Sequence, residues 1–275
     1  MSFHRSVRPL NYVYLYTSWY NIKEVYLVDA VRTPIGKYGG TLGTVRQDDL
    51  LSAAITGLLA RYPALHLPDD VIIGCANQAG EDNQNIARFS ALLAGLPDSV
   101  PGVTVNRLCG SGMQAVVDGS LRIGSGYGDM IISGGVESMT RAPFVLPKSE
   151  APFQRAVTVA DTTFGWRFTN TRFLEKYDAL QMGETAEVLA AKYSITREAQ
   201  DAFALQSHQR YFQAVQQGKY REQIIPVEAK SSGGEVQRKH VNDRLQRRSA
   251  QSRYDPGETG STQAGVQSRR HGYGR

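Results

Sequence analysis

The chain has 275 residues, of which 41% are hydrophobic and 21% charged, as is typical of a globular protein with one large domain or two ordinary ones. Its two cysteines exclude a disulfide framework and a cysteine-based structural zinc site. Because no stretch approaches the roughly 18 uninterrupted apolar residues that a membrane span requires, we expect no membrane partner.

The net charge of +5 is confined to the C-terminal end of the chain. Residues 231–275 hold nine Lys or Arg and four Asp or Glu, so the rest of the chain is neutral. This segment is also poor in aliphatic residues and has no hydrophobic periodicity, which predicts a disordered basic tail. A solvated tail and a nucleic-acid-binding arm are both compatible with this pattern.

Residues 1–23 form a second atypical segment. Their apolar stretch is interrupted by Asn11, Thr17 and Ser18, and no small-residue cleavage site follows, which argues against a signal peptide. We therefore expect a disordered extension, or an upstream start that is not the true one, on a cytoplasmic protein.

Residues 24–230 alternate between strand and helix patterns. Strands are expected at residues 24–31, 70–76, 103–106, 130–133 and 223–228. Helices are expected from Asp48 or Asp49 to Leu59, and at residues 85–95, 110–123, 183–193 and 197–217. The helix at 85–95 would bury one apolar face made of Ile86, Phe89, Leu92 and Leu93. This alternation predicts an α/β fold with a parallel sheet covered on both faces, into which residues 140–182 insert as a loop region.

Cys109 is the strongest candidate for a catalytic residue. It lies between an expected strand and a helix that begins at Gly110-Ser111-Gly112. A helix N-terminus carries partial positive charge and unpaired N–H groups, which favour the nucleophilic thiolate. Cys75, in contrast, lies in an apolar strand and is expected in the core. No group of His, Cys, Asp and Glu has metal-ligand spacing, so no metal site is expected.

The segment around Cys109, NRLCGSGM at 106–113, resembles the nucleophile motif of the thiolases, which are acyl-CoA acyltransferases. Three further segments resemble the same family in the same order: VDAVRTPIG at 28–36, GGVESMT at 134–140 and MGETAE at 182–187. The segments at 74–83 and 161–168 resemble most the β-ketoadipyl-CoA branch of this family. The resemblance covers residues 24–230 and implies a thiolase-type layered α/β fold.

The resemblance implies that Cys109 attacks the 3-keto carbon of a 3-ketoacyl-CoA, with 3-oxoadipyl-CoA and acetoacetyl-CoA as candidate substrates. Acetyl-CoA would leave, and free CoA would then take the acyl group from Cys109; the reverse reaction is a condensation. CoA is thus a substrate, and no bound cofactor is expected. Met182 matches a position that lines the pantetheine channel in the family. Family members are dimers or tetramers, so a homo-oligomer is expected.

The resemblance also implies a catalytic His, a second catalytic Cys and an Asn that holds a water, all in a C-terminal half. We expect this half to be missing, because none of the five histidines lies in the family's Gly-His-Pro setting and there is no third cysteine. His66 and His208 are expected to be solvated. Two alternatives therefore remain: an inactive thiolase fragment, and a related decarboxylating condensing enzyme, although the motifs around the cysteine differ in those enzymes.

The codons that could encode residues 254–275 also allow a second reading frame. Read one base later, they allow TTPEKLARLKPAFNPAGTVTAG, which resembles the thiolase sequence just before the C-terminal domain. This predicts a frameshift between about residue 227 and Tyr254. The basic charge of the tail would then be an accident of reading frame, so we expect no nucleic-acid partner.

Overall fold

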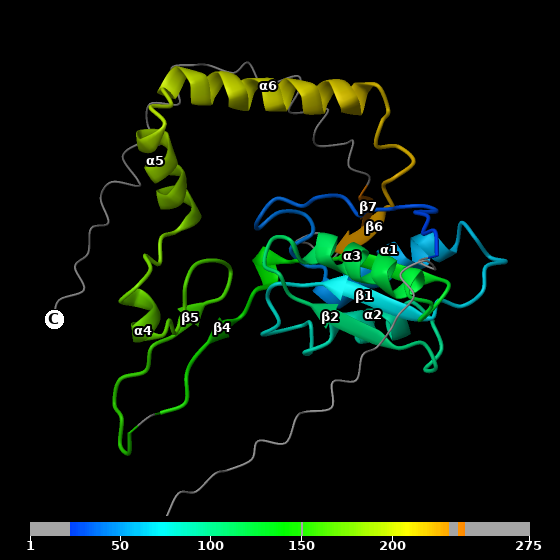
Figure 1. Cartoon of the computed structure of the whole chain (residues 1–275), viewed down its shortest axis with the longest axis horizontal. Helices are drawn as coiled ribbons and strands as arrows, with labels where there is room; N and C mark the ends of the chain where they lie inside the picture. Colours follow the sequence, from blue (N-terminus) through cyan, green and yellow to red (C-terminus); the bar gives the residue numbers. More distant parts are fainter. Residues whose placement is uncertain (1–22, 150, 231–235, 240–275) are drawn as a thin grey trace, which may run out of the picture.

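The computed structural model describes residues 23–149, 151–230 and 236–239 (Figure 1). At its centre is a parallel sheet with the order β2-β1-β3, made of β1 (Asp70–Gly74), β2 (Gly102–Val105) and β3 (Ile131–Gly135). Val71 lies opposite Gly102 on one side and Ile132 on the other, which fixes the register. Because β1 is paired on both edges, its residues are buried along its whole length. The expected α/β fold with a parallel sheet is confirmed.

Helices cover both faces of this sheet. α1 (Gln47–Leu59) and α2 (Ile86–Leu93) pack together over one face, where Val71 and Ile73 join the main core cluster. α3 (Ser111–Gly124) packs along β1 and β3 on the opposite face (Figure 1). Since successive side chains of a strand point to opposite faces, Ile72 points toward α3.

The buried face of α2 differs in part from the one expected. Asn85 caps the helix, as its side chain accepts the N–H of Arg88 at 3.2 Å. Ile86 is buried as expected, together with Ala87, Ser90 and Ala91, but Phe89, Leu92 and Leu93 are 40–54% exposed. A Cβ on Gly102 would lie 2.8 Å from the backbone nitrogen of Arg88, so at this point the helix backbone lies directly against β2 and leaves no room for a large side chain.

The strand expected at residues 24–31 is absent. The segment is irregular, and Tyr26, Leu27 and Val28 are 73–85% exposed. Beside it, Lys23 donates its N–H to Gly124 O, and Arg32 pairs with Ile224 in an isolated bridge. An apolar run becomes a strand only where a neighbouring strand completes its hydrogen bonds, and hydrophobic patterning alone does not provide that neighbour.

The strand expected at 223–228 is displaced toward the C-terminus. β6 (Val227–Lys230) instead pairs antiparallel with β7 (Val236–Lys239). β7 lies inside the segment expected to be a disordered tail, so regular structure continues past the expected boundary at residue 230. The remainder of that segment, and the expected extension up to residue 22, lie outside the described residues.

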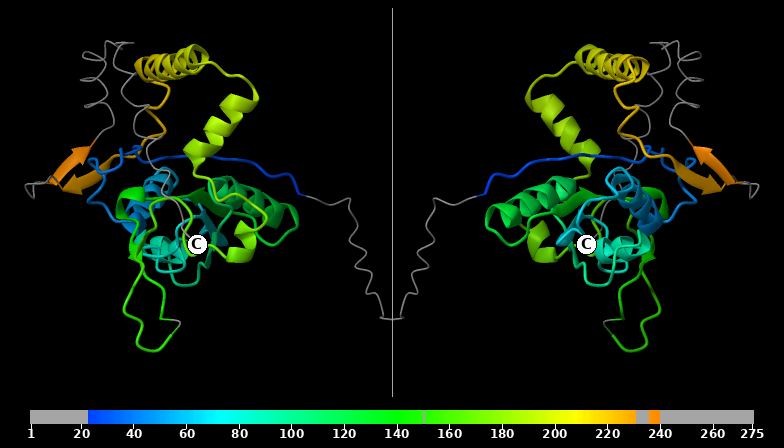
Figure 2. Two further views of the ribbon diagram at one scale, coloured as in Figure 1. Left: turned by 90° about the vertical axis from the view of Figure 1, so that its left-hand side faces the viewer. Right: turned by 90° about the vertical axis from the view of Figure 1, so that its right-hand side faces the viewer.

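Residues 140–182 are largely irregular, as expected for a loop region. They contain the end of the short helix η1 (Met139–Arg141), the ribbon of β4 (Phe144–Val145) with β5 (Ala160–Asp161), and α4 (Thr171–Leu174). α5 (Met182–Lys192) and α6 (Arg197–Gln216) follow and stand away from the sheet (Figures 1 and 2). Neither helix buries any of its residues.

Among the helices that the structure describes, we find none with the length and apolar character of a membrane span.

Candidate active site

Cys109 lies in the turn between β2 and α3, at the carboxyl edge of the parallel sheet. The expected strand–turn–helix setting is therefore present, and the side chain of Cys109 is exposed. The preceding residue, Leu108, has φ +50°, a left-handed conformation that is costly for a bulky side chain. Such a turn persists only where its surroundings hold it in place.

Ser111 closes this turn from within. Its buried hydroxyl accepts the N–H of Arg107 at 2.8 Å and donates to the carbonyl oxygen of Leu108 at 2.6 Å. The backbone N–H of Ser111 donates to the same carbonyl at 3.0 Å. The two residues that precede Cys109 are thus fixed to the first residue of α3.

Glycines bring the start of α3 directly onto the ends of the strands. A Cβ on Gly74 would lie 2.1 Å from the carbonyl carbon of Ser111, and one on Gly135 would lie 3.0 Å from the Cα of Gly112. No side chain could occupy the position of the first of these. The free N–H groups at the start of α3 are therefore held beside the carboxyl ends of β1 and β3, where an anionic group could bind.

Two polar side chains connect the ends of all three strands at Ala76. The amide nitrogen of Asn106, just after β2, donates to Ala76 O at 2.9 Å. The carboxylate of Glu137, just after β3, accepts the N–H of Ala76 at 2.9 Å and that of Asn77 at 3.3 Å. Sequence reasoning missed both roles, although an Asn two residues before Leu108 is a typical turn-forming residue.

Asn77 connects this edge to the loop region. Its amide nitrogen donates to the backbone oxygen of Thr162 at 3.0 Å and to its hydroxyl at 3.1 Å. The buried hydroxyl of Thr162 in turn donates to Pro143 O at 2.6 Å. The Oδ1 atom of Asn77 is buried and has no hydrogen-bond partner. Pro143 and Thr162 are thereby fixed to the residues that follow β1.

Cys75 has the opposite environment to Cys109. It is 1% exposed, its sulfur accepts from the Gln47 amide at 3.1 Å, and its thiol donates to Asn77 O at 3.2 Å. Burial, together with the negative charge of Glu137, raises the pKa of Cys75 to about 12. The expectation of a core residue is confirmed.

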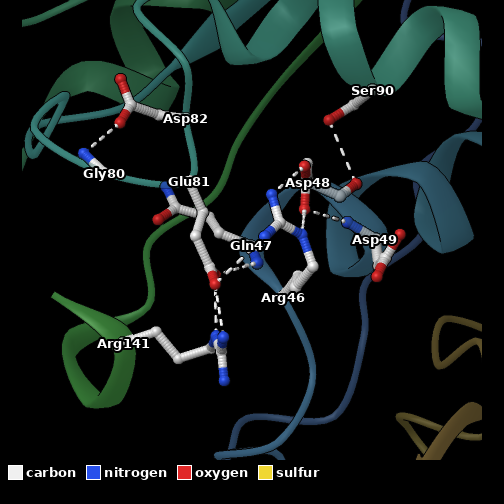
Figure 3. A network of polar contacts seen from close by, with 9 residues as sticks. All are labelled: Arg46, Gln47, Asp48, Asp49, Gly80, Glu81, Asp82, Ser90 and Arg141. Carbon is white, nitrogen blue, oxygen red and sulfur yellow. Dashed lines mark hydrogen bonds and ion pairs between the residues drawn. The ribbon is translucent and has the colours of Figure 1, made fainter. Parts of the chain in front are cut away.

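A second polar network fixes the loop that follows β1 (Figure 3). Glu81 accepts from Arg141 through two guanidinium nitrogens and also lies 3.4 Å from a guanidinium nitrogen of Arg46. Arg46 in turn binds both carboxylate oxygens of Asp48 at 2.9 and 2.8 Å. The hydrogen bonds from Arg141 lower the pKa of Glu81. The network thus holds the β1 loop between α1 and η1.

The other candidates lie away from Cys109. Met182 is 79% exposed at the start of α5, which stands apart from α3 (Figure 1), so the structure does not bring Met182 to the thiol. His66 is exposed in a loop and His208 is exposed on α6, as expected. In residues 23–149, 151–230 and 236–239, no group of three or more His, Cys, Asp or Glu could hold a metal.

Comparison with known proteins agrees with this geometry. The model of the family "Thiolase, N-terminal domain" matches residues 25–259. The chain is 51% identical over 216 residues to the β-ketoadipyl-CoA thiolase of Pseudomonas knackmussii, covering 78% of this chain and 54% of that protein. It is 50% identical over 217 residues to the 3-oxoadipyl-CoA/3-oxo-5,6-dehydrosuberyl-CoA thiolase of Escherichia coli, with the same coverage.

A solved structure shows the same fold. The acetyl-CoA acetyltransferase of Bacillus anthracis superposes with a TM-score of 0.66 at 35% sequence identity, covering 76% of this chain and 52% of that one. The chain therefore spans about half the length of the curated relatives it matches. The extent of the family match and the level of identity together show that this chain belongs to the thiolase family.

Proposed function

We propose that this chain is the nucleophile-bearing half of an acyl-CoA C-acyltransferase that cleaves 3-ketoacyl-CoA thioesters. The observation that carries this is the exposed thiol of Cys109 in a strained turn at the N-terminus of α3, within a chain of the thiolase family. Here a thiolate can reach a bound thioester, and free N–H groups can stabilise charge that develops on a substrate oxygen.

The proposed reaction has two steps. The Cys109 thiolate attacks the 3-keto carbon, the bond between C2 and C3 breaks, and the C2 carbanion takes a proton and leaves as acetyl-CoA. The shortened acyl group remains on Cys109 as a thioester. The thiol of free CoA then gives up its proton, attacks that thioester and releases Cys109 as thiolate. CoA is a substrate in this scheme, and no bound cofactor is required.

We propose 3-oxoadipyl-CoA as the preferred substrate, with acetoacetyl-CoA as a smaller alternative. The support is the identity of about 50% to proteins named for β-ketoadipyl-CoA and 3-oxoadipyl-CoA. With 3-oxoadipyl-CoA, the acyl group on Cys109 is succinyl. Met182 is retained as a contact to the pantetheine arm, which requires α5 to approach the sheet when substrate binds.

Proton transfer to the departing carbanion needs an acid that the described residues do not supply near Cys109. The exposed His66 and His208 lie on other elements, and Cys75 is buried and protonated near neutral pH. An inactive fragment therefore remains the second candidate for this chain taken alone.

We further propose that two copies associate through the free edge of β2 in the cytoplasm, where CoA thioesters are made and consumed. β2 lies at an edge of the described sheet, and the helix packed beside it, α2, exposes Phe89, Leu92 and Leu93. Light scattering should then give twice the chain mass, and Leu93→Glu should give the mass of one chain.

The test of the reaction is release of acetyl-CoA from 3-oxoadipyl-CoA by the purified chain, with and without free CoA. Turnover that needs CoA, is faster than with acetoacetyl-CoA and is absent in Cys109→Ala would support an active thiolase. A single equivalent of acetyl-CoA per chain would indicate a half enzyme that forms the acyl thioester only. No release from a folded chain would favour the inactive fragment.

A further inference from the structure

The side chain of Asn106 holds the turn that carries Cys109 at two points. Its Oδ1 atom accepts the N–H of Leu108 at 2.9 Å, inside the turn. Its Nδ2 atom donates to Ala76 O at 2.9 Å, at the end of the neighbouring strand β1. Because one planar amide makes both bonds, the turn cannot move relative to β1 without breaking at least one of them.

Glu137 holds the same residue of the β1 end from the other side. Its two carboxylate oxygens accept the N–H groups of Ala76 and Asn77 at 2.9 and 3.3 Å. Ala76 is thus fixed through its carbonyl by Asn106 and through its N–H by Glu137. The turn after β2 is therefore held in position relative to the ends of both β1 and β3.

Neither residue is explained by packing. Asn106 and Glu137 are both exposed, so they do not fill the core. What they hold is the segment that includes Leu108, whose left-handed backbone is unfavourable for a residue with a branched side chain. The turn would relax toward ordinary backbone angles if its external bonds were lost, and Cys109 would move away from the start of α3.

We propose that Asn106 and Glu137 are positioning residues that keep the thiol of Cys109 at the N-terminus of α3. The proposal rests on the proposed function in that Cys109 is taken as the nucleophile. It adds two residues that act through the backbone of Ala76 rather than on substrate.

The test is the rate of alkylation of Cys109 by iodoacetamide in the full 275-residue chain, measured by peptide mass spectrometry. The native rate is divided by the rate in the same chain unfolded in urea, which removes the intrinsic reactivity of the thiol. Cys75 serves as an internal reporter, because it stays unlabelled while the core is intact. The variants are Asn106→Ala and Glu137→Gln; in the latter an amide nitrogen faces one of the two N–H donors.

Asn170→Ala is the matched control. Asn170 accepts the N–H of Arg172 at 2.9 Å, which is the same bond over the same spacing as that from Leu108 to Asn106, but at the start of α4. The Asn170→Ala variant therefore removes a turn-forming Asn but leaves the Cys109 turn unchanged.

We expect a native-to-unfolded ratio above one in the wild-type chain. Asn106→Ala and Glu137→Gln should each lower it by about threefold or more, with Cys75 still unlabelled and Asn170→Ala unchanged, because reactivity follows the stabilisation of the thiolate. A wild-type ratio of one or less would overturn the proposal. A decrease of the ratio by less than threefold in both variants would also overturn it. So would labelling of Cys75 in both variants, because that would indicate a role in folding only. Since no acyl-CoA is used, failure of acyl transfer is detected separately.

Discussion

At the scale of residues, Cys75 and Cys109 carry the same thiol in opposite environments. Cys75 is enclosed between α1 and the β1 loop, whereas Cys109 is exposed at a helix N-terminus. Burial keeps the thiol of Cys75 protonated near neutral pH, so it has no nucleophilic form there. The two side chains should therefore be separable by mutation.

Cys75→Ala should lower the free energy of unfolding by about 1–2 kcal/mol, because it removes a buried sulfur with two hydrogen bonds. It should still form an acyl adduct. Cys109→Ala should lose the adduct yet stay within about 0.5 kcal/mol of the wild-type stability, since its side chain is exposed. Urea unfolding and intact-mass measurements check both, and a chain acylated on Cys75 would contradict the assignment.

Glu81 gives the chain a specific dependence on pH. Glu81→Gln should cost about 1–2 kcal/mol at neutral pH, because it breaks a two-point, partly buried pair with Arg141. The pKa of Glu81 is lowered in the fold, so its contribution is present above the ordinary Glu pKa of about 4.3 and is lost as the pH falls further.

Urea unfolding at a series of pH values measures this difference. The stabilities of wild type and Glu81→Gln should converge in acid, while Glu175→Gln, which changes an exposed carboxylate at the end of α4, should follow the wild type throughout. If the difference in the free energy of unfolding between wild type and Glu81→Gln does not change with pH, the ion pair of Glu81 with Arg141 is not the cause of that difference.

At the scale of elements, the position of α3 depends on glycines in the strands beneath it. Gly74→Ala should destabilise the chain by about 3 kcal/mol or more, since its Cβ would overlap the backbone of Ser111 at 2.1 Å. Gly112→Ala in the same junction should be tolerated, because its Cβ would meet its nearest neighbour at an ordinary 3.7 Å. Thermal unfolding distinguishes them, and equal midpoints would disprove the close approach.

The sequence predicted the elements whose partners are close along the chain. β1, α2, β2, α3 and β3 lie within one or two residues of their expected positions, because each strand is followed by the helix that covers it. The strand predicted at 24–31 is absent because a strand depends on a partner that is remote along the chain. The inward face of α2 was predicted correctly at Ile86 and wrongly at Phe89, Leu92 and Leu93, because the helix backbone lies directly against Gly102.

The supporting side chains of the site could not be predicted in the same way. The hydrogen-bonded pairs are far apart in the sequence: Asn106 and Ala76 are separated by 30 positions, Glu137 and Ala76 by 61, and Asn77 and Thr162 by 85. Local periodicity contains no information on such pairs. The setting of Cys109 could be predicted because it depends only on adjacent elements, a strand end and a helix start.

At the scale of the whole molecule, one face of α3 lacks a covering layer in the described part of the chain. Met113, Val117 and Leu121 recur every four residues along it and are 42–70% exposed. A continuous apolar stripe of this kind is an interaction surface or an aggregation site. The solubility of the chain should therefore be limited by this exposed stripe.

Leu121→Lys should therefore raise the concentration at which the chain stays monodisperse, with a change in stability within about 0.5 kcal/mol. Ala115→Lys, on the buried face of the same helix, should unfold the chain. Light scattering and circular dichroism measure the two effects. Loss of stability in Leu121→Lys would mean that the stripe is covered within the chain.

The most direct test of Cys109 as the nucleophile is the intact mass of the purified chain after exposure to acetoacetyl-CoA, with Cys109→Ala beside it. We predict one acetyl group per wild-type chain, located on Cys109 by peptide mapping and removed by free CoA, and no adduct on Cys109→Ala. An adduct of the same yield on the alanine variant, or none on a folded wild-type chain, would contradict an acyl-cysteine intermediate on this residue.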